Sequence, residues 1–148
     1  MPPFDGAGMP TPGSLSESHA IRSPAHVEYG ASAVDALEPF AADRDADSAL
    51  VVTDGHLAES GVIDAPRARL EAAGVDVEVY DGVAPEPKLS MVEAAAERVA
   101  GHDLVVGVGG GSSMDTAKFA AALAANGGAV RDMLGMDEVP GPTGPLAL

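Results

Sequence analysis

The feature that most constrains the fold is an alternation of short apolar runs with segments whose apolar residues have helical spacing. Apolar runs typical of strands buried on both faces occupy residues 49–53 and 103–108, and a strictly alternating run occupies residues 75–80. Segments with a helical pattern follow these runs, at residues 65–73, 90–100 and 113–125. Because parallel strands need a crossover between them, this order predicts an α/β fold: a Rossmann-like parallel sheet with helices on both faces.

Local signals mark where several of these elements should begin and end. Residues 26–29 alternate apolar and polar side chains, so we expect an edge strand there, followed by a short helix through Phe40. The expected boundary residues are Ser32 and Ser90 as helix N-caps, Gly74 and Gly101 as helix ends, and Asp81-Gly82 as a turn.

The chain is strongly acidic, with 23 Asp and Glu against 8 Lys and Arg and a formal net charge of −15. A nucleic-acid partner needs a basic surface, so the charge argues against this class of partner. The acidic residues are scattered through helices and turns, which fits a solvated surface in high salt, where screening weakens self-repulsion. We therefore hypothesise a halophilic source, which requires that the stability of the chain depends on molar salt.

The absence of cysteine and the short apolar runs exclude several further classes of protein. The chain has no cysteine, which excludes disulfides and thiolate metal sites. No apolar run approaches the roughly 18 residues that a membrane span needs. Residues 1–23 lack the basic start and apolar stretch of a secretory signal, so we expect a cytoplasmic protein. We expect a flexible Pro-, Gly- and Ser-rich leader at residues 1–23 and a single domain at residues 24–148.

Three consecutive glycines and a serine, Gly109 to Ser112, lie between a predicted buried strand and a predicted Ala-rich helix. Without side chains, the backbone N–H groups of this loop can approach an anion closely, and the positive end of the helix dipole points to the same place. The loop therefore predicts a pyrophosphate site. The alternative is a tight strand-to-helix turn, which needs only one glycine.

Asp54 follows the predicted strand at residues 49–53, at the edge of the sheet where ligands of this fold class bind. Its carboxylate can accept hydrogen bonds from both hydroxyls of an adenosine ribose and would repel a phosphate at the 2′ position. This favours NAD over NADP as the cofactor. The structural alternative is that Asp54 caps a helix or a turn.

The segment from Gly109 to Lys118, GGGSSMDTAK, resembles the GGGSxxDxAK signature of the iron-containing alcohol dehydrogenases. Other stretches agree with that family in order and spacing: Val27–Gly30, Val51–Asp54, Leu70–Val75 and Asp81–Pro87. The resemblance runs from about Ala25 to the last residue. One departure lies between two prolines, where the family often has an Asn that touches the cofactor and this chain has Glu86.

The resemblance implies the NAD(P)-binding domain of an oxidoreductase that transfers a hydride between nicotinamide and an alcohol or aldehyde. The implied cofactor contacts are Asp54 with the adenosine ribose, Gly110, Gly111 and Ser112 with the pyrophosphate, Ser113 and Met114 along the cofactor, and Asp115 on the nicotinamide side. NAD is the expected cofactor and NADP is possible. A small alcohol or aldehyde is the implied substrate of the complete enzyme.

The family's all-helical domain, whose Asp and three His bind a divalent metal such as iron or zinc, would follow Pro145–Leu148. We therefore expect a chain that is truncated before that domain and inactive alone, with a homo-oligomer or a separate metal-binding chain as a possible partner. No metal site is predicted among the dispersed histidines: His19, His26, His56 and His102. Two other hypotheses stay open, a truncated or non-catalytic nucleotide-binding chain and an unrelated anion-binding α/β domain.

Overall fold

Four parallel strands form one sheet in the order β2-β1-β3-β4. The computed structural model describes residues 26–86, 88–134 and 141–148, so the predicted leader at residues 1–23 lies outside the described residues. The strands are β1 (Ser48–Asp54), β2 (Asp76–Val83), β3 (Leu104–Gly107) and β4 (Leu146–Ala147). The chain runs from β1 outward to β2 and then returns past β1 to β3, so the direction of winding reverses between β1 and β3. In open α/β sheets this reversal is the switch point at which ligands bind.

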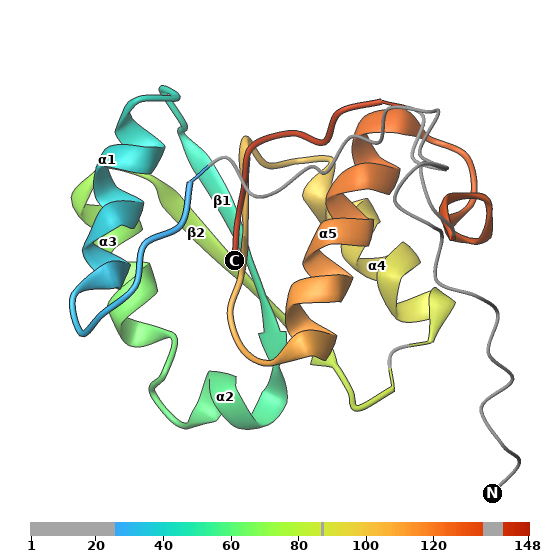
Figure 1. Cartoon of the computed structure of the whole chain (residues 1–148), viewed down its shortest axis with the longest axis horizontal. Helices are drawn as coiled ribbons and strands as arrows, with labels where there is room; N and C mark the ends of the chain where they lie inside the picture. The colour runs from blue at the N-terminus through green and yellow to red at the C-terminus, as the bar shows by residue number, and fades with distance from the viewer. Residues whose placement is uncertain (1–25, 87, 135–140) are drawn as a thin grey trace, which may run out of the picture.

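Helices cover both faces of the sheet (Figure 1). One face packs against α1 (Leu37–Ala42) and α3 (Asp64–Ala72), and the other against α4 (Leu89–Val99) and α5 (Gly111–Asn126). The connections from β1 to β2 and from β2 to β3 run in opposite directions along the sheet. Because both crossovers have the same handedness, they place their helices on opposite faces. The predicted α/β class and the two helical layers are therefore confirmed. Three short pieces complete the described chain: the 3₁₀ turns η1 (Ala33–Ala36) and η2 (Val130–Met133), and the helix α2 (Gly55–Glu59).

Strand β1 lies at the centre of the core, and its residues from Ala49 to Thr53 are completely buried. Successive side chains alternate between the two layers: Leu50 and Val52 pack with α4 and α5, and Ala49 and Val51 with α1 and α3. This two-sided burial explains why the run at residues 49–53 is apolar without alternation. Within the described ranges, no helix is long and apolar enough to cross a membrane.

The predicted edge strand at residues 26–29 is wrong. These residues have no regular structure, and Val27 and Tyr29 are 67% and 91% exposed. Four alternating residues form a strand only when a sheet edge supplies hydrogen-bond partners, and no described strand pairs with them. The sequence pattern of residues 26–29 does not show whether a strand of the sheet lies beside them.

Several predicted boundaries also move. Asp81-Gly82 does not turn the chain, because β2 continues to Val83 and its end pairs with Asp54. Ser90 lies inside α4, whose N-cap is Lys88, and Ser32 precedes η1 without a side-chain capping bond. Gly74 is confirmed as the end of α3, with φ of +85° and its N–H donating to the Glu71 carbonyl at 2.9 Å.

Candidate functional site

Gly109, the first residue of the glycine loop, is the one that the fold itself requires. Its φ of +137° lies in a region that other residues rarely adopt. A Cβ at this position would lie 2.8 Å from Leu57 Cδ1 and 2.8 Å from Ser113 Oγ. Both the backbone conformation and the packing therefore exclude a side chain here.

Gly110 and Gly111 are different, because neither has a positive φ and a Cβ on either would meet nothing within 4 Å. The turn thus needs one glycine, and the other two only keep side chains out of an open space. This is the arrangement expected where a ligand approaches the backbone closely. It supports the pyrophosphate interpretation over a simple strand-to-helix turn.

The backbone donors that border this space belong to the first turn of α5. Helix α5 begins at Gly111, two residues before the predicted start, and Gly110 is its N-cap. The first hydrogen bond of the helix joins the Met114 N–H to the Gly110 carbonyl at 3.1 Å. The N–H groups of Gly111, Ser112 and Ser113 therefore have no carbonyl within the helix, and Gly110 offers no side chain to cap them. Together with the helix dipole, these three donors favour an anion.

Asp54 lies on the other side of the switch point, at the end of β1. The Val108 N–H donates to the Val52 carbonyl at 2.9 Å, which holds the ends of β1 and β3 together. The Asp54 carboxylate caps α2: its Oδ1 accepts a hydrogen bond from the Leu57 N–H at 2.9 Å. The capping alternative is therefore realised. An ionised carboxylate has about four acceptor positions, so one capping bond leaves capacity for ribose hydroxyls. The ribose role stays a prediction.

The remaining predicted residues follow along α5. Ser113 is buried beneath Gly109, and Met114 is half-buried, with its Cα 3.4 Å from the position of a Cβ on Gly107. Ser112 uses its carbonyl to accept a hydrogen bond from Thr116 Oγ1 at 2.7 Å. Asp115 is exposed and faces Lys118 Nζ at 3.4 Å. Asp54 and residues 110–113 thus share one edge of the sheet, whereas Asp115 lies further along the helix surface.

Gly107 and Leu57 contribute to the site, but sequence reasoning missed both. A Cβ on Gly107 would lie 2.9 Å from Ala117 Cβ, so this glycine allows α5 to lie close against β3. An isolated glycine inside a strand signals such a close approach, and Gly107 carried that signal. Leu57 has no signal in the sequence, because its contact with Gly109 joins segments that are far apart in the chain.

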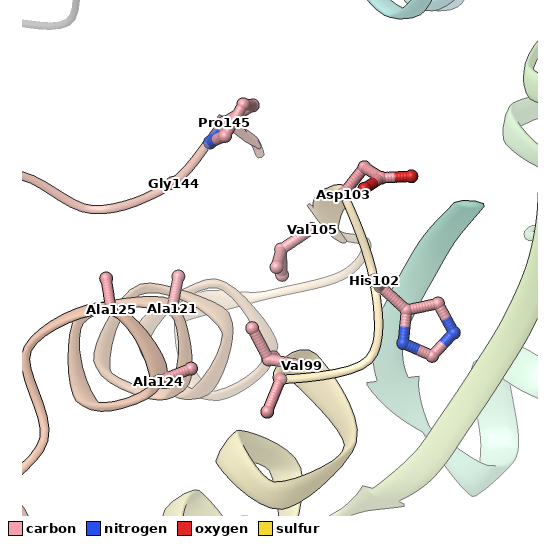
Figure 2. Close-up of a pocket in the computed structure, with 10 residues that line it drawn as sticks. Val99, His102, Asp103, Val105, Ala121, Ala124, Ala125, Gly144 and Pro145 are labelled. Atoms are coloured by element: carbon pink, nitrogen blue, oxygen red, sulfur yellow. The ribbon is translucent and has the colours of Figure 1, made fainter. Parts of the chain in front are cut away.

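A cavity of about 200 Å³ lies at the opposite edge of the sheet (Figure 2). Its walls are mostly aliphatic side chains of α4 and α5, closed by Gly144 and Pro145 and bordered by His102 and Asp103. Since Asp103 precedes β3 and the glycine loop follows it, the cavity and the loop lie at opposite ends of that strand. The cavity therefore does not include the predicted cofactor residues.

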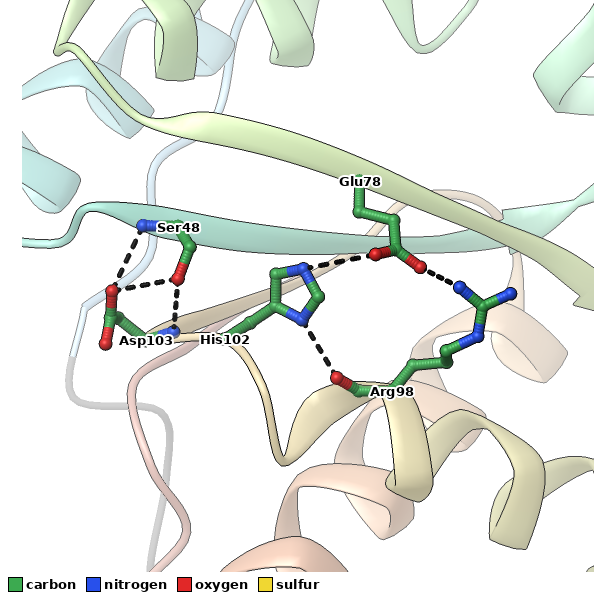
Figure 3. A network of polar contacts seen from close by, with 5 residues as sticks. All are labelled: Ser48, Glu78, Arg98, His102 and Asp103. Atoms are coloured by element: carbon green, nitrogen blue, oxygen red, sulfur yellow. Dashed lines mark hydrogen bonds and ion pairs between the residues drawn. The ribbon is translucent and has the colours of Figure 1, made fainter.

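Polar contacts next to this cavity hold the amino ends of the strands together (Figure 3). Asp103 Oδ2 accepts hydrogen bonds from Ser48 Oγ at 2.9 Å and from the N–H groups of Asp47 and Ser48 at 3.1 Å. These bonds, that of the Ser48 hydroxyl first, lower the pKa of the Asp103 carboxyl below its ordinary value.

A second set of contacts in the same network involves His102, whose Nδ1 bonds to the Arg98 carbonyl at 2.8 Å. Its Nε2 lies 3.6 Å from the Glu78 carboxylate, which also pairs with Arg98. These contacts are structural, because they join β2 to the end of α4. His26 and His56 are exposed at other places, and His19 lies outside the described residues.

The comparison with protein families gives a match to the iron-containing alcohol dehydrogenases over residues 24–148. The chain belongs to this family. Among its relatives is long-chain-alcohol dehydrogenase 1 of Geobacillus thermodenitrificans, which is 42% identical over 113 residues. That match covers 75% of this chain and 28% of the relative, so the chain spans less than a third of the relative's length.

Solved structures of the family have the same fold. NADH-dependent butanol dehydrogenase A from Thermotoga maritima superposes with a TM-score of 0.75 and 26% identity, over 88% of this chain and 33% of that one. An archaeal halo-thermophilic alcohol dehydrogenase from a Red Sea brine pool superposes with a TM-score of 0.65 and 31% identity, over 76% of this chain and 31% of that one. Family membership removes the hypothesis of an unrelated anion-binding domain.

The family is iron-containing, which raises the question of whether the residues described here could hold the metal. Within residues 26–86, 88–134 and 141–148, no three His, Asp or Glu side chains are grouped closely enough to bind an ion. These residues do not fit a metal, and no chemical step through one follows from them.

Proposed function

We propose that this chain binds NAD(H) across the switch point between β1 and β3. In this proposal the N–H groups of Gly111, Ser112 and Ser113 bind the pyrophosphate, and Asp54 binds the adenosine ribose. One observation carries the proposal: Gly110 and Gly111 leave open space in front of backbone donors that the helix cannot satisfy. The butanol dehydrogenase from Thermotoga maritima is NADH-dependent, which agrees with the choice of cofactor.

Within the complete enzyme, this domain would orient the nicotinamide for reversible hydride transfer to or from a small alcohol or aldehyde. The bound cofactor supplies the hydride chemistry. The residues described here would bind and orient it: the loop would fix the diphosphate, and Asp54 would fix the adenosine ribose. Because the helix fixes these backbone donors, they need no rearrangement to bind the diphosphate.

The test is a titration of NADH against the chain, followed by NADH fluorescence, with the variant Gly111→Val. A valine side chain would fill the open space in front of the amides without a backbone penalty, since φ of Gly111 is not positive. We expect the Kd for NADH to rise at least tenfold, or about 1.4 kcal/mol. Unchanged affinity would contradict the proposal, as would a folded, unaltered chain that binds no NADH.

Gly144→Val is the matched control for this experiment. Gly144 is also a glycine without positive φ whose Cβ would meet nothing within 4 Å, but it lies at the other edge of the sheet. We expect its NADH affinity to equal that of the unaltered chain. Equal losses in both variants would show that the effect of Gly111→Val does not come from the site.

A further inference from the structure

Leu57 is the point at which the two halves of the proposed cofactor site touch. Its N–H donates to Asp54 Oδ1 at 2.9 Å, and its Cδ1 lies 2.8 Å from the position that a Cβ on Gly109 would take. Asp54 ends β1, whereas Gly109 follows β3. A single half-buried residue of α2 therefore contacts the carboxylate through its backbone and the glycine loop through its side chain.

Two side chains lie on the side of Gly109 where a Cβ would point, because Ser113 Oγ lies as close to that Cβ position as Leu57 Cδ1 does, at 2.8 Å. A glycine has more backbone conformations available than any other residue, so a glycine loop keeps one shape only where neighbours restrict it. Ser113 belongs to the helix that follows the loop, whereas Leu57 comes from a different strand-to-helix connection. Beside the backbone bond from Val108 to Val52, Leu57 is thus a side-chain contact that relates the loop to the Asp54 side of the site.

We infer that Leu57 is a positioning residue that fixes the distance between the Asp54 carboxylate and the glycine loop. The inference rests on the proposed function, since a dinucleotide must contact both parts at once. A ligand that bridges two subsites gains affinity only when their separation matches its own length, and a small misplacement removes much of the gain. Leu57 would act without contacting the reacting atoms.

The experiment is a double-mutant cycle in which NADH affinity is measured by fluorescence titration. Leu57→Ala keeps the N–H that Asp54 caps and removes only the side chain that contacts Gly109. We expect it to weaken NADH binding about tenfold in the unaltered background, but less than about threefold when Asp54→Ala has already removed the carboxylate. Leu57→Met, which restores most of the volume, should recover affinity to within about threefold of the unaltered chain.

Leu123→Ala is the control for loss of stability alone. Leu123 is also a half-buried leucine, but it packs against the core between α4 and α5 near the end of α5. It should lower the thermal midpoint about as much as Leu57→Ala does and leave NADH affinity unchanged.

Each outcome of the cycle decides the inference. Equal factors for Leu57→Ala in both backgrounds, or no loss in either, would overturn it while leaving the proposed function intact. A loss that Leu57→Met does not reverse, or that Leu123→Ala reproduces, would also overturn it. If the unaltered chain folds and binds no NADH, the proposed function itself fails.

Discussion

Single residues in this site have a structural role as well as the proposed binding role. Asp54 caps α2 through the Leu57 N–H and is also proposed to bind the adenosine ribose. Ser113 packs beneath Gly109, while its N–H belongs to the first turn of α5, where the helix supplies no acceptor. A substitution at such a position must therefore remove the cofactor contact and keep the structural contact before a loss of binding can be interpreted.

Asp54→Asn makes this separation. The amide oxygen can still accept the Leu57 N–H, so we expect the free energy of unfolding to change by less than about 0.5 kcal/mol. Because the amide is neutral, it no longer repels a 2′-phosphate, and the ratio of the Kd for NADPH to that for NADH should fall at least tenfold. Both constants can be measured by fluorescence titration.

Asp54→Ala provides the comparison, because it removes the cap as well and should cost about 1 kcal/mol of stability. A cofactor ratio that is the same in the Asn variant and the unaltered chain would remove Asp54 from the site.

At the level of elements, the sequence correctly predicted the strands whose residue pattern depends only on burial. The runs at residues 49–53 and 103–108 are apolar because both faces of β1 and β3 are covered, so their pattern identified central strands. The strand at residues 26–29 and the turn at Asp81-Gly82 were wrong, because pairing decides both and pairing depends on a distant segment. The same limit hid Leu57, whereas the glycine loop was recognisable from consecutive residues.

The amino ends of the strands allow a prediction about pH. A carboxyl whose pKa is lowered by folding contributes stability above its unfolded pKa, and this contribution is lost as the pH falls through the lower folded pKa. Since hydrogen bonds from Ser48 and Asp47 lower the pKa of Asp103 below its ordinary 3.8, the loss belongs below about pH 4. We expect the unaltered chain to be more stable than Asp103→Asn at pH 6, with a smaller difference at pH 3.

Denaturant unfolding of both proteins at the two pH values measures this difference. A gap in the free energy of unfolding that stays constant between pH 6 and pH 3 would show that the Asp103 carboxylate is not the source of the stabilisation.

For the molecule as a whole, the net charge of −15 works against binding an anionic dinucleotide. Long-range repulsion is screened within about 8–10 Å at physiological salt, so short-range donors can still determine binding. The basic residue of the GGGSSMDTAK segment, Lys118, faces Asp115. The attraction for the diphosphate is therefore expected to come from the backbone N–H groups at the switch point. The halophilic source stays a hypothesis.

The most direct test of this central claim is a titration of the ¹⁵N-labelled chain with NADH, followed by the amide resonances in two-dimensional NMR. We expect the largest shifts at the amides of Gly111, Ser112 and Ser113, and none at residues 99–105, which include residues that line the cavity at the opposite edge. Shifts confined to residues 99–105, with the glycine-loop amides unchanged, would contradict the account.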